Sequence, residues 1–96
     1  MIFREVNMKF APLKSAQIRA ARALVRWRAE DLARESSVGI ATIRRAELAV
    51  EETSMTAAND LAVRRALEAA GVEFIDENGG GPGVRLRTST KEKSRK

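Results

Sequence analysis

Apolar residues recur at intervals of three and four along much of the chain, the spacing that puts them on one face of an α-helix. Ile18, Ala21 and Val25 form the first such stripe and predict a helix from about residue 15 to residue 26. Serine is a favoured residue at helix N-termini, so Ser15 is expected to cap this helix.

A second stripe predicts a helix within residues 56–70, and Gly71 follows it as a C-terminal stop. Its apolar members are Val63, Ala66, Leu67 and Ala70. Asp60 lies on the same stripe, and burying a carboxylate is costly. We therefore expect the helix to begin late, with Asn59 or Asp60 at its N-cap.

The period of the pattern then changes to two. Residues 72–75 (VEFI) and 84–87 (VRLR) predict two strands, and the glycine-rich segment 78–83 between them predicts the loop of a β-hairpin. The acidic residues available to pair with Arg85 and Arg87 are Glu73, Asp76 and Glu77.

A hairpin alone is marginally stable in water, so this one is expected to pack on the helices or to pair with a second copy of itself. The strand residues expected to join two copies are Val72, Phe74, Val84 and Leu86.

Residues 29–48, AEDLARESSVGIATIRRAEL, predict two short helices that cross steeply around a tight turn. The first helix is expected over about 29–35, the polar pair Ser36–Ser37 forms the turn, and the second helix follows Gly39. The small side chain of Ala33 lets the two helices approach. The residues expected to fill the space between them are Leu32, Val38 and Ile43.

The second of these helices is expected to present Ile40, Ala41, Arg44 and Arg45 to solvent, a face that suits the major groove of DNA. Arg45 is the first candidate for a base reader, because arginine pairs bidentately with guanine. Arg44 is expected to read a base or to grip a phosphate. Without a partner, the same arginines form only a solvated helix face. The leading interpretation is a helix-turn-helix DNA-binding protein.

Composition limits the other chemistries. The chain has 96 residues, enough for one domain, and it contains neither Cys nor His. These absences remove disulfides, thiolate sites, the commonest metal ligand and the usual general base, so no metal, cofactor or enzymatic activity is expected. No apolar run is long enough to cross a bilayer, and the start MIFREVNMKF lacks the pattern of a signal peptide. A cytoplasmic location is therefore expected.

The formal net charge of +5 lies wholly in residues 85–96, where six cations face one acid. Within the rest of the chain, the segment between Val6 and Ala29 holds six cations and no acid. If that segment folds beside the helix that follows Gly39, one face of the domain becomes basic, as phosphate binding requires. The tail over 88–96 is expected to be disordered and either attracts DNA non-specifically or only solubilises the chain.

Together these segments resemble the XRE family, the small helix-turn-helix regulators that include the lambdoid phage repressors. The similarity runs from about Leu13 to Gly71 and extends loosely through the hairpin, which looks like the ending of many short bacterial regulators of this type. The residues and motifs that carry it are Ile18, Arg22, Ala23, Leu24, Trp27, Glu30-Asp31-Leu32-Ala33, Val38, Thr42-Ile43-Arg44-Arg45, Glu47 and RRALEAAGVEFI.

The resemblance implies a mostly α fold, a lambda-repressor-like helix-turn-helix domain of four to five helices followed by a C-terminal β-hairpin. The expected organisation is an N-terminal arm over 1–12, the helix-turn-helix domain over 13–71, the hairpin over 72–87 and the basic tail over 88–96.

The resemblance also implies roles for individual residues. Arg28 stands at the start of the helix over 29–35, where relatives contact phosphate. Arg22 and Glu47 correspond to an ion pair that fixes the angle of the recognition helix in phage repressors. Ser37 stands where relatives usually have Gly, so we expect it to adopt a left-handed conformation. The implied DNA contacts besides Arg44 and Arg45 are Gly39, Ile40, Ala41 and Thr42.

We therefore expect a regulator, more readily a repressor than an activator, that binds a double-stranded operator. One short helix makes few base contacts, so a homodimer is expected, and its twofold symmetry would match a palindromic operator. The alternative is a protein-interaction module on the same fold, antitoxin-like or antiactivator-like, with weak or no specific DNA binding.

Overall fold

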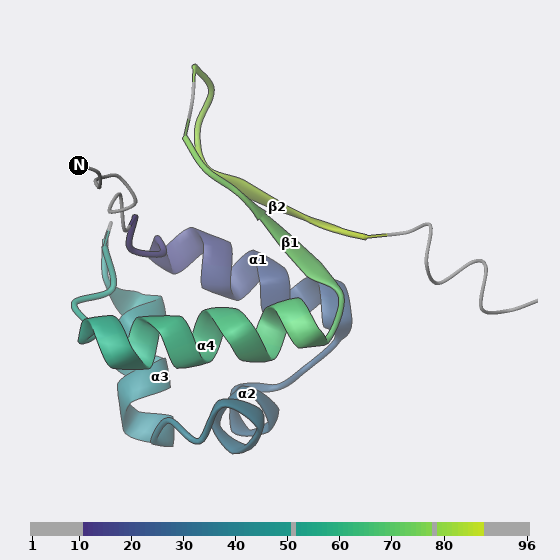
Figure 1. Ribbon diagram of the computed structural model, residues 1–96. Helices are drawn as coiled ribbons and strands as arrows, with labels where there is room; N and C mark the ends of the chain where they lie inside the picture. Colours follow the sequence, from purple (N-terminus) through teal and green to yellow (C-terminus); the bar gives the residue numbers. More distant parts are fainter. Residues whose placement is uncertain (1–10, 51, 78, 88–96) are drawn as a thin grey trace, which may run out of the picture.

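The computed structural model describes residues 11–50, 52–77 and 79–87 (Figure 1). Within them, four helices are followed by one antiparallel two-stranded hairpin, which confirms the expected order of helices and strands. The elements are α1 (Ser15–Val25), α2 (Ala29–Ser36), α3 (Ile40–Leu48), α4 (Ala57–Ala69), β1 (Val72–Ile75) and β2 (Gly83–Leu86). Most of the expected N-terminal arm and the whole of the expected basic tail lie outside the described residues.

The core forms where the four helices and the start of β1 meet. The three residues expected between α2 and α3, Leu32, Val38 and Ile43, are all buried there. The other buried apolar residues are Leu13, Ile18, Ala21, Ala46, Val63, Leu67 and Val72. None of the helices in the described part of the chain is long and apolar enough to cross a membrane.

The expected cap of α1 is wrong. Lys14 is the N-cap residue, and its backbone N–H donates to the side-chain oxygen of Gln17 (3.0 Å). Ser15 is instead the first residue of the helix. Its buried hydroxyl donates to the carbonyl of Ala49 (2.8 Å), so it is used to tie α1 to the segment after α3.

The expected late start of α4 is also wrong. Thr56 caps the helix, and its hydroxyl accepts the backbone N–H of Asn59 (3.1 Å). Asp60 lies inside the first turn, only 1% exposed, because one of its oxygens accepts the backbone N–H of Leu13 (2.9 Å). Its second oxygen, Oδ1, has no hydrogen-bond partner among the described residues. Burial raises the pKa of Asp60, and the hydrogen bond from Leu13 opposes that rise.

Gly71 ends α4 with φ +110°, a backbone conformation that other residues rarely adopt, as the expected stop requires. The hairpin that follows turns its apolar face onto the helices. Val72 is completely buried in the domain's own core, and Phe74 and Val84 pack half-buried against it. The expectation that Val72 contacts a second copy is therefore corrected, since its side chain is used within one chain. Only Leu86 of the expected set is exposed.

The outer face of the hairpin carries its charges. Glu73 and Arg85 lie opposite each other in the register and form a two-pronged contact (3.1 and 3.3 Å), one of the expected pairings. Arg85 lowers the pKa of Glu73 through these bonds. Arg87 forms no ion pair with an acid of the described residues. It donates to the carbonyls of Glu68 (2.8 Å) and Val72 (3.4 Å), which ties the end of the hairpin to α4.

The hairpin is also held from below by α1 and from the side by α4. Gln17 on α1 is buried and donates to the carbonyls of Ile75 (3.3 Å) and Gly83 (3.1 Å), at the far end of the strands. Arg64 on α4 lies over the ring of Phe74, 5.2 Å from its centre. These contacts fix the hairpin against the helices, although its tip projects beyond them (Figure 1).

Candidate nucleic-acid interface

The connection between α2 and α3 is a tight turn closed by one buried hydroxyl. Ser36 donates to the carbonyl of Leu32 (2.7 Å) and accepts the backbone N–H of Val38 (3.2 Å). Ser37 has φ 61° and ψ 26°, the expected left-handed conformation. Gly39 is the N-cap of α3 and offers no side chain. The first turn of α3 therefore receives no hydrogen bond from a capping side chain.

The face of α3 that turns away from the core carries the residues expected to contact DNA. The helix buries Ile43, Ala46 and Glu47. Its exposed and half-buried residues on the other side are Ile40, Ala41, Thr42, Arg44 and Arg45. All five are accessible, so the structure brings the expected α3 residues together on one surface.

The two arginines on this face differ in their surroundings. Arg44 is 58% exposed and its guanidinium contacts the carboxylate of Glu30 on α2 (3.0 Å). Arg45 has no acidic partner within the described residues. A guanidinium without a carboxylate keeps its donors available for a base or a phosphate. Arg45 is therefore the stronger of the two candidates.

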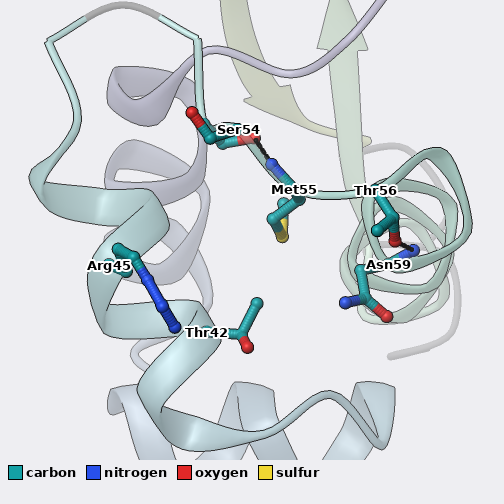
Figure 2. Close-up of a pocket in the computed structure, with 7 residues that line it drawn as sticks. Thr42, Arg45, Ser54, Met55, Thr56 and Asn59 are labelled. Atoms are coloured by element: carbon teal, nitrogen blue, oxygen red, sulfur yellow. Dashed lines mark hydrogen bonds between the residues drawn. The ribbon is translucent and has the colours of Figure 1, made fainter.

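A hollow of about 210 Å³ adjoins Arg45, between α3 and the start of α4 (Figure 2). Thr42 and Arg45 on α3 lie on one side of it, and Thr56 and Asn59 of α4 on the other. The remaining lining residues come from the loop between these helices and are Thr53, Ser54 and Met55. Sequence reasoning missed this hollow, because the expected late start of α4 removed Thr56 from the helix terminus.

The chemistry of the hollow suits a phosphate group. Its lining includes the guanidinium of Arg45, the amide of Asn59 and the hydroxyl of Thr42, groups that can contact a phosphate oxygen. The loop itself is ordered by side chains: Thr53 is buried and its hydroxyl accepts the N–H of Met55 (3.3 Å). Ser54 has a left-handed backbone (φ 64°) and an exposed side chain.

The expected Arg22–Glu47 pair is formed and it joins α1 to the end of α3. The guanidinium of Arg22 contacts both oxygens of Glu47 (2.7 and 2.8 Å) and also donates to the carbonyl of Trp27 (2.9 Å). Arg19 donates to the backbone carbonyl of Glu47 (2.6 Å). The hydrogen bond to Glu47 raises the pKa of Arg22. Four hydrogen bonds thus hold α1, the α1–α2 connection and α3 in one orientation.

The start of α2 carries the expected phosphate contact, Arg28, as its N-cap residue. The backbone N–H of Arg28 donates to Asp31 (2.8 Å), and Arg34 contacts the same carboxylate (3.1 Å). Both contacts lower the pKa of Asp31, and the hydrogen bond from Arg28 has the larger effect. The side chain of Arg28 remains exposed.

The expected basic face is formed only in part. Arg19 and Arg22 of α1 do lie against α3, but Glu47 balances one of these charges. Lys14 lies near the carboxylate of Glu52 (3.6 Å), which balances its charge. Lys9, another cation of this segment, lies outside the described residues.

An apolar pair stands out beside the end of α3. Leu48 is 83% exposed and Val50 is 96% exposed. Leu48 borders a second hollow whose arginines are engaged, Arg22 with Glu47 and Arg44 with Glu30. This hollow therefore presents mainly the aliphatic parts of those side chains.

The sequence matches no protein-family model and no curated protein. Within the described part of the chain, no cluster of acidic residues has the arrangement needed to hold a metal ion.

Proposed function

We propose that this chain is a DNA-binding regulator in which α2, the serine turn and α3 form a helix-turn-helix. The observation that carries the proposal is Arg45, whose guanidinium has no acidic partner among the described residues and lies on the exposed face of α3 beside a hollow at the start of α4. A helix that enters the major groove needs such a face, with phosphate contacts on either side of it.

The proposed contacts follow from this geometry. The N-terminal half of α3 lies along base edges, where Ile40 and Ala41 contact thymine methyl groups and Arg45 pairs with guanine. Thr42 and the residues around the hollow hold one phosphate. Arg28, at the start of α2, holds a phosphate on the other strand. Arg44 strengthens the α2–α3 orientation through Glu30 and contributes less to base reading.

The protein acts as a homodimeric repressor of the XRE type in this proposal. The resemblance of residues 13–71 to that family supports it, as does the small reading surface of a single α3. Two copies would read half-sites about one helical turn of DNA apart.

The experiment is a selection of binding sites from a random duplex pool, followed by affinity measurements on the enriched duplex and a scrambled one. Arg45→Ala should lose about 1–3 kcal/mol of discrimination at one base pair. Arg44→Ala should lower affinity more evenly across sequences. Arg65→Ala on α4 is the matched control, because Arg65 is exposed and borders neither hollow. Equal discrimination by all three variants would contradict the proposal.

A second candidate function is protein binding on the same fold, and the exposed pair Leu48 and Val50 favours it. The two functions differ in salt dependence, because phosphate contacts release counterions and protein contacts of apolar residues do not. Leu48→Ser with Val50→Ser should leave DNA affinity nearly unchanged if the first proposal holds. No measurable affinity for the selected pool at low salt would favour the second.

A further inference from the structure

The pattern of hydrogen bonds between β1 and β2 shows which backbone groups point away from the partner strand. The N–H of Arg87 donates to the carbonyl of Gly71 (2.9 Å), which makes these two residues a hydrogen-bonded pair of the antiparallel ladder. Such pairs alternate with non-bonded pairs. Arg85 is therefore bonded to Glu73, whereas Val84 and Leu86 turn their N–H and carbonyl groups away from β1.

The two edges of the hairpin are not equivalent. On β1, the outward carbonyl of Val72 accepts a hydrogen bond from the guanidinium of Arg87 (3.4 Å), so this edge is already occupied at that position. On β2, the outward groups of Val84 and Leu86 face no other strand within the described residues. An open row of N–H and carbonyl groups is a template for a further strand.

We propose that two copies of this chain pair through the outer edge of β2 in antiparallel orientation. This inference rests on the homodimer of the proposed function and names the surface that forms it. Val84 then forms a hydrogen-bonded pair with the partner's Leu86, and Leu86 one with the partner's Val84. Each pair exchanges two bonds, and the twofold axis passes beside Arg85.

The side chains of both sheet faces agree with this register. Val84 and the exposed Leu86 extend their apolar strip across the junction, on the side that packs against α1. On the opposite side, Arg85 meets the partner's Arg85, a contact of like charges that would weaken pairing. Glu73 already holds each of these guanidinium groups with two contacts (3.1 and 3.3 Å), which balances that charge within each chain.

A single cysteine tests this register directly, because the chain contains none. In a non-bonded antiparallel pair the Cα atoms lie about 4.5 Å apart, within the range of a disulfide. Arg85→Cys should therefore form a covalent dimer within minutes of mild oxidation without DNA. Arg65→Cys, exposed on α4, is the control and should crosslink only slowly. Equal rates for the two variants would overturn the proposed edge.

A second pair of variants tests the edge without crosslinking. Leu86→Pro removes an N–H that points away from β1, so the hairpin keeps its own hydrogen bonds while the edge is blocked. Leu86→Ala loses the same apolar side chain but keeps the N–H. Sedimentation without DNA should give Leu86→Pro a dimer Kd at least about tenfold above that of Leu86→Ala. Equal dimer Kd values, with circular dichroism showing both variants folded, would overturn the proposal.

These measurements separate the dimer surface from the proposed function. If the edge forms the dimer, monomeric Leu86→Pro should still bind a duplex carrying one half-site with the affinity of Leu86→Ala. If both variants fail to bind any duplex while only Leu86→Ala dimerises, the edge stands and the DNA proposal fails.

Discussion

Replacing Arg22 by Met tests the clamp that holds α1 to the end of α3. The change keeps much of the apolar stem and removes the guanidinium that contacts both oxygens of Glu47 and the carbonyl of Trp27. The side chains of Arg22 and Glu47 are 23% and 10% exposed, so the carboxylate left behind is largely buried and loses its main partner.

Removing one partner of a fully buried ion pair costs about 3–5 kcal/mol. The remaining exposure of this pair reduces the cost, and we expect Arg22→Met to lower the free energy of unfolding by about 2–4 kcal/mol. For a domain of this size, each kcal/mol corresponds to a shift in Tm of about 4–8 °C. The expected fall in Tm is therefore about 8–32 °C.

A urea titration monitored by circular dichroism measures the change in the free energy of unfolding. Arg22→Lys is the matched control, since it keeps the charge but cannot make the two-pronged contact, and should lose less than Arg22→Met. The double variant Arg22→Met with Glu47→Leu should recover most of the loss, because no buried charge remains. A loss below about 0.5 kcal/mol for Arg22→Met, with additive effects in the double variant, would refute the reasoning.

Three further predictions concern the turn, the start of α4 and the buried carboxylate. Ser37→Gly should stabilise the fold by about 0.5–1 kcal/mol, because the left-handed conformation of Ser37 is strained for serine and is adopted freely by glycine. Ser36→Gly removes the hydroxyl that closes the turn and should destabilise the fold. Thermal melts of the two variants should therefore show shifts of opposite sign. Thr56→Ala should lower the free energy of unfolding by about 1 kcal/mol because the helix cap is lost, and it should also weaken DNA binding. Thr56→Ser should retain both the stability and the DNA affinity. Thermal melts and the affinity for the selected duplex measure the two effects. Because burial raises the pKa of Asp60 above its ordinary value of 3.8, the folded chain holds this proton at a pH where the unfolded chain has released it. The stability of the unchanged protein relative to Asp60→Asn should therefore rise as the pH falls from about 7 to about 4, and a difference in urea midpoint that stays flat over this range would contradict that sign.

The contacts that sequence reasoning predicted are those set by local spacing or by a familiar pair. Leu32, Val38 and Ile43 are buried because their spacing places them between two crossing helices. Ser37 was expected to be left-handed because the resemblance places it where relatives usually have Gly, and its φ is 61°. Arg22 and Glu47 were identified by a resemblance, since 25 residues separate them.

The errors concern polar residues whose partners lie far along the chain. Ser15 has the chemistry of a cap, but Ala49 takes its hydroxyl. Asp60 was expected to stay out of the core because burying a carboxylate is costly. The backbone N–H of Leu13, 47 residues away, donates to this carboxylate and makes its burial possible. Because of that second error, the sequence analysis did not identify Thr56 as the cap of α4 or the hollow beside Arg45. No local pattern announces such partners, because only the tertiary packing brings them together.

An NMR titration of the labelled protein with the duplex that the selection enriches tests most directly whether α3 reads DNA. If α3 reads DNA, the largest backbone shift changes should fall on residues 39–42 and 45 and on the loop over 53–56, with smaller changes at Arg28. Changes that fall instead on Leu48, Val50 and the second hollow, with the start of α3 unaffected, would contradict the claim that α3 reads DNA.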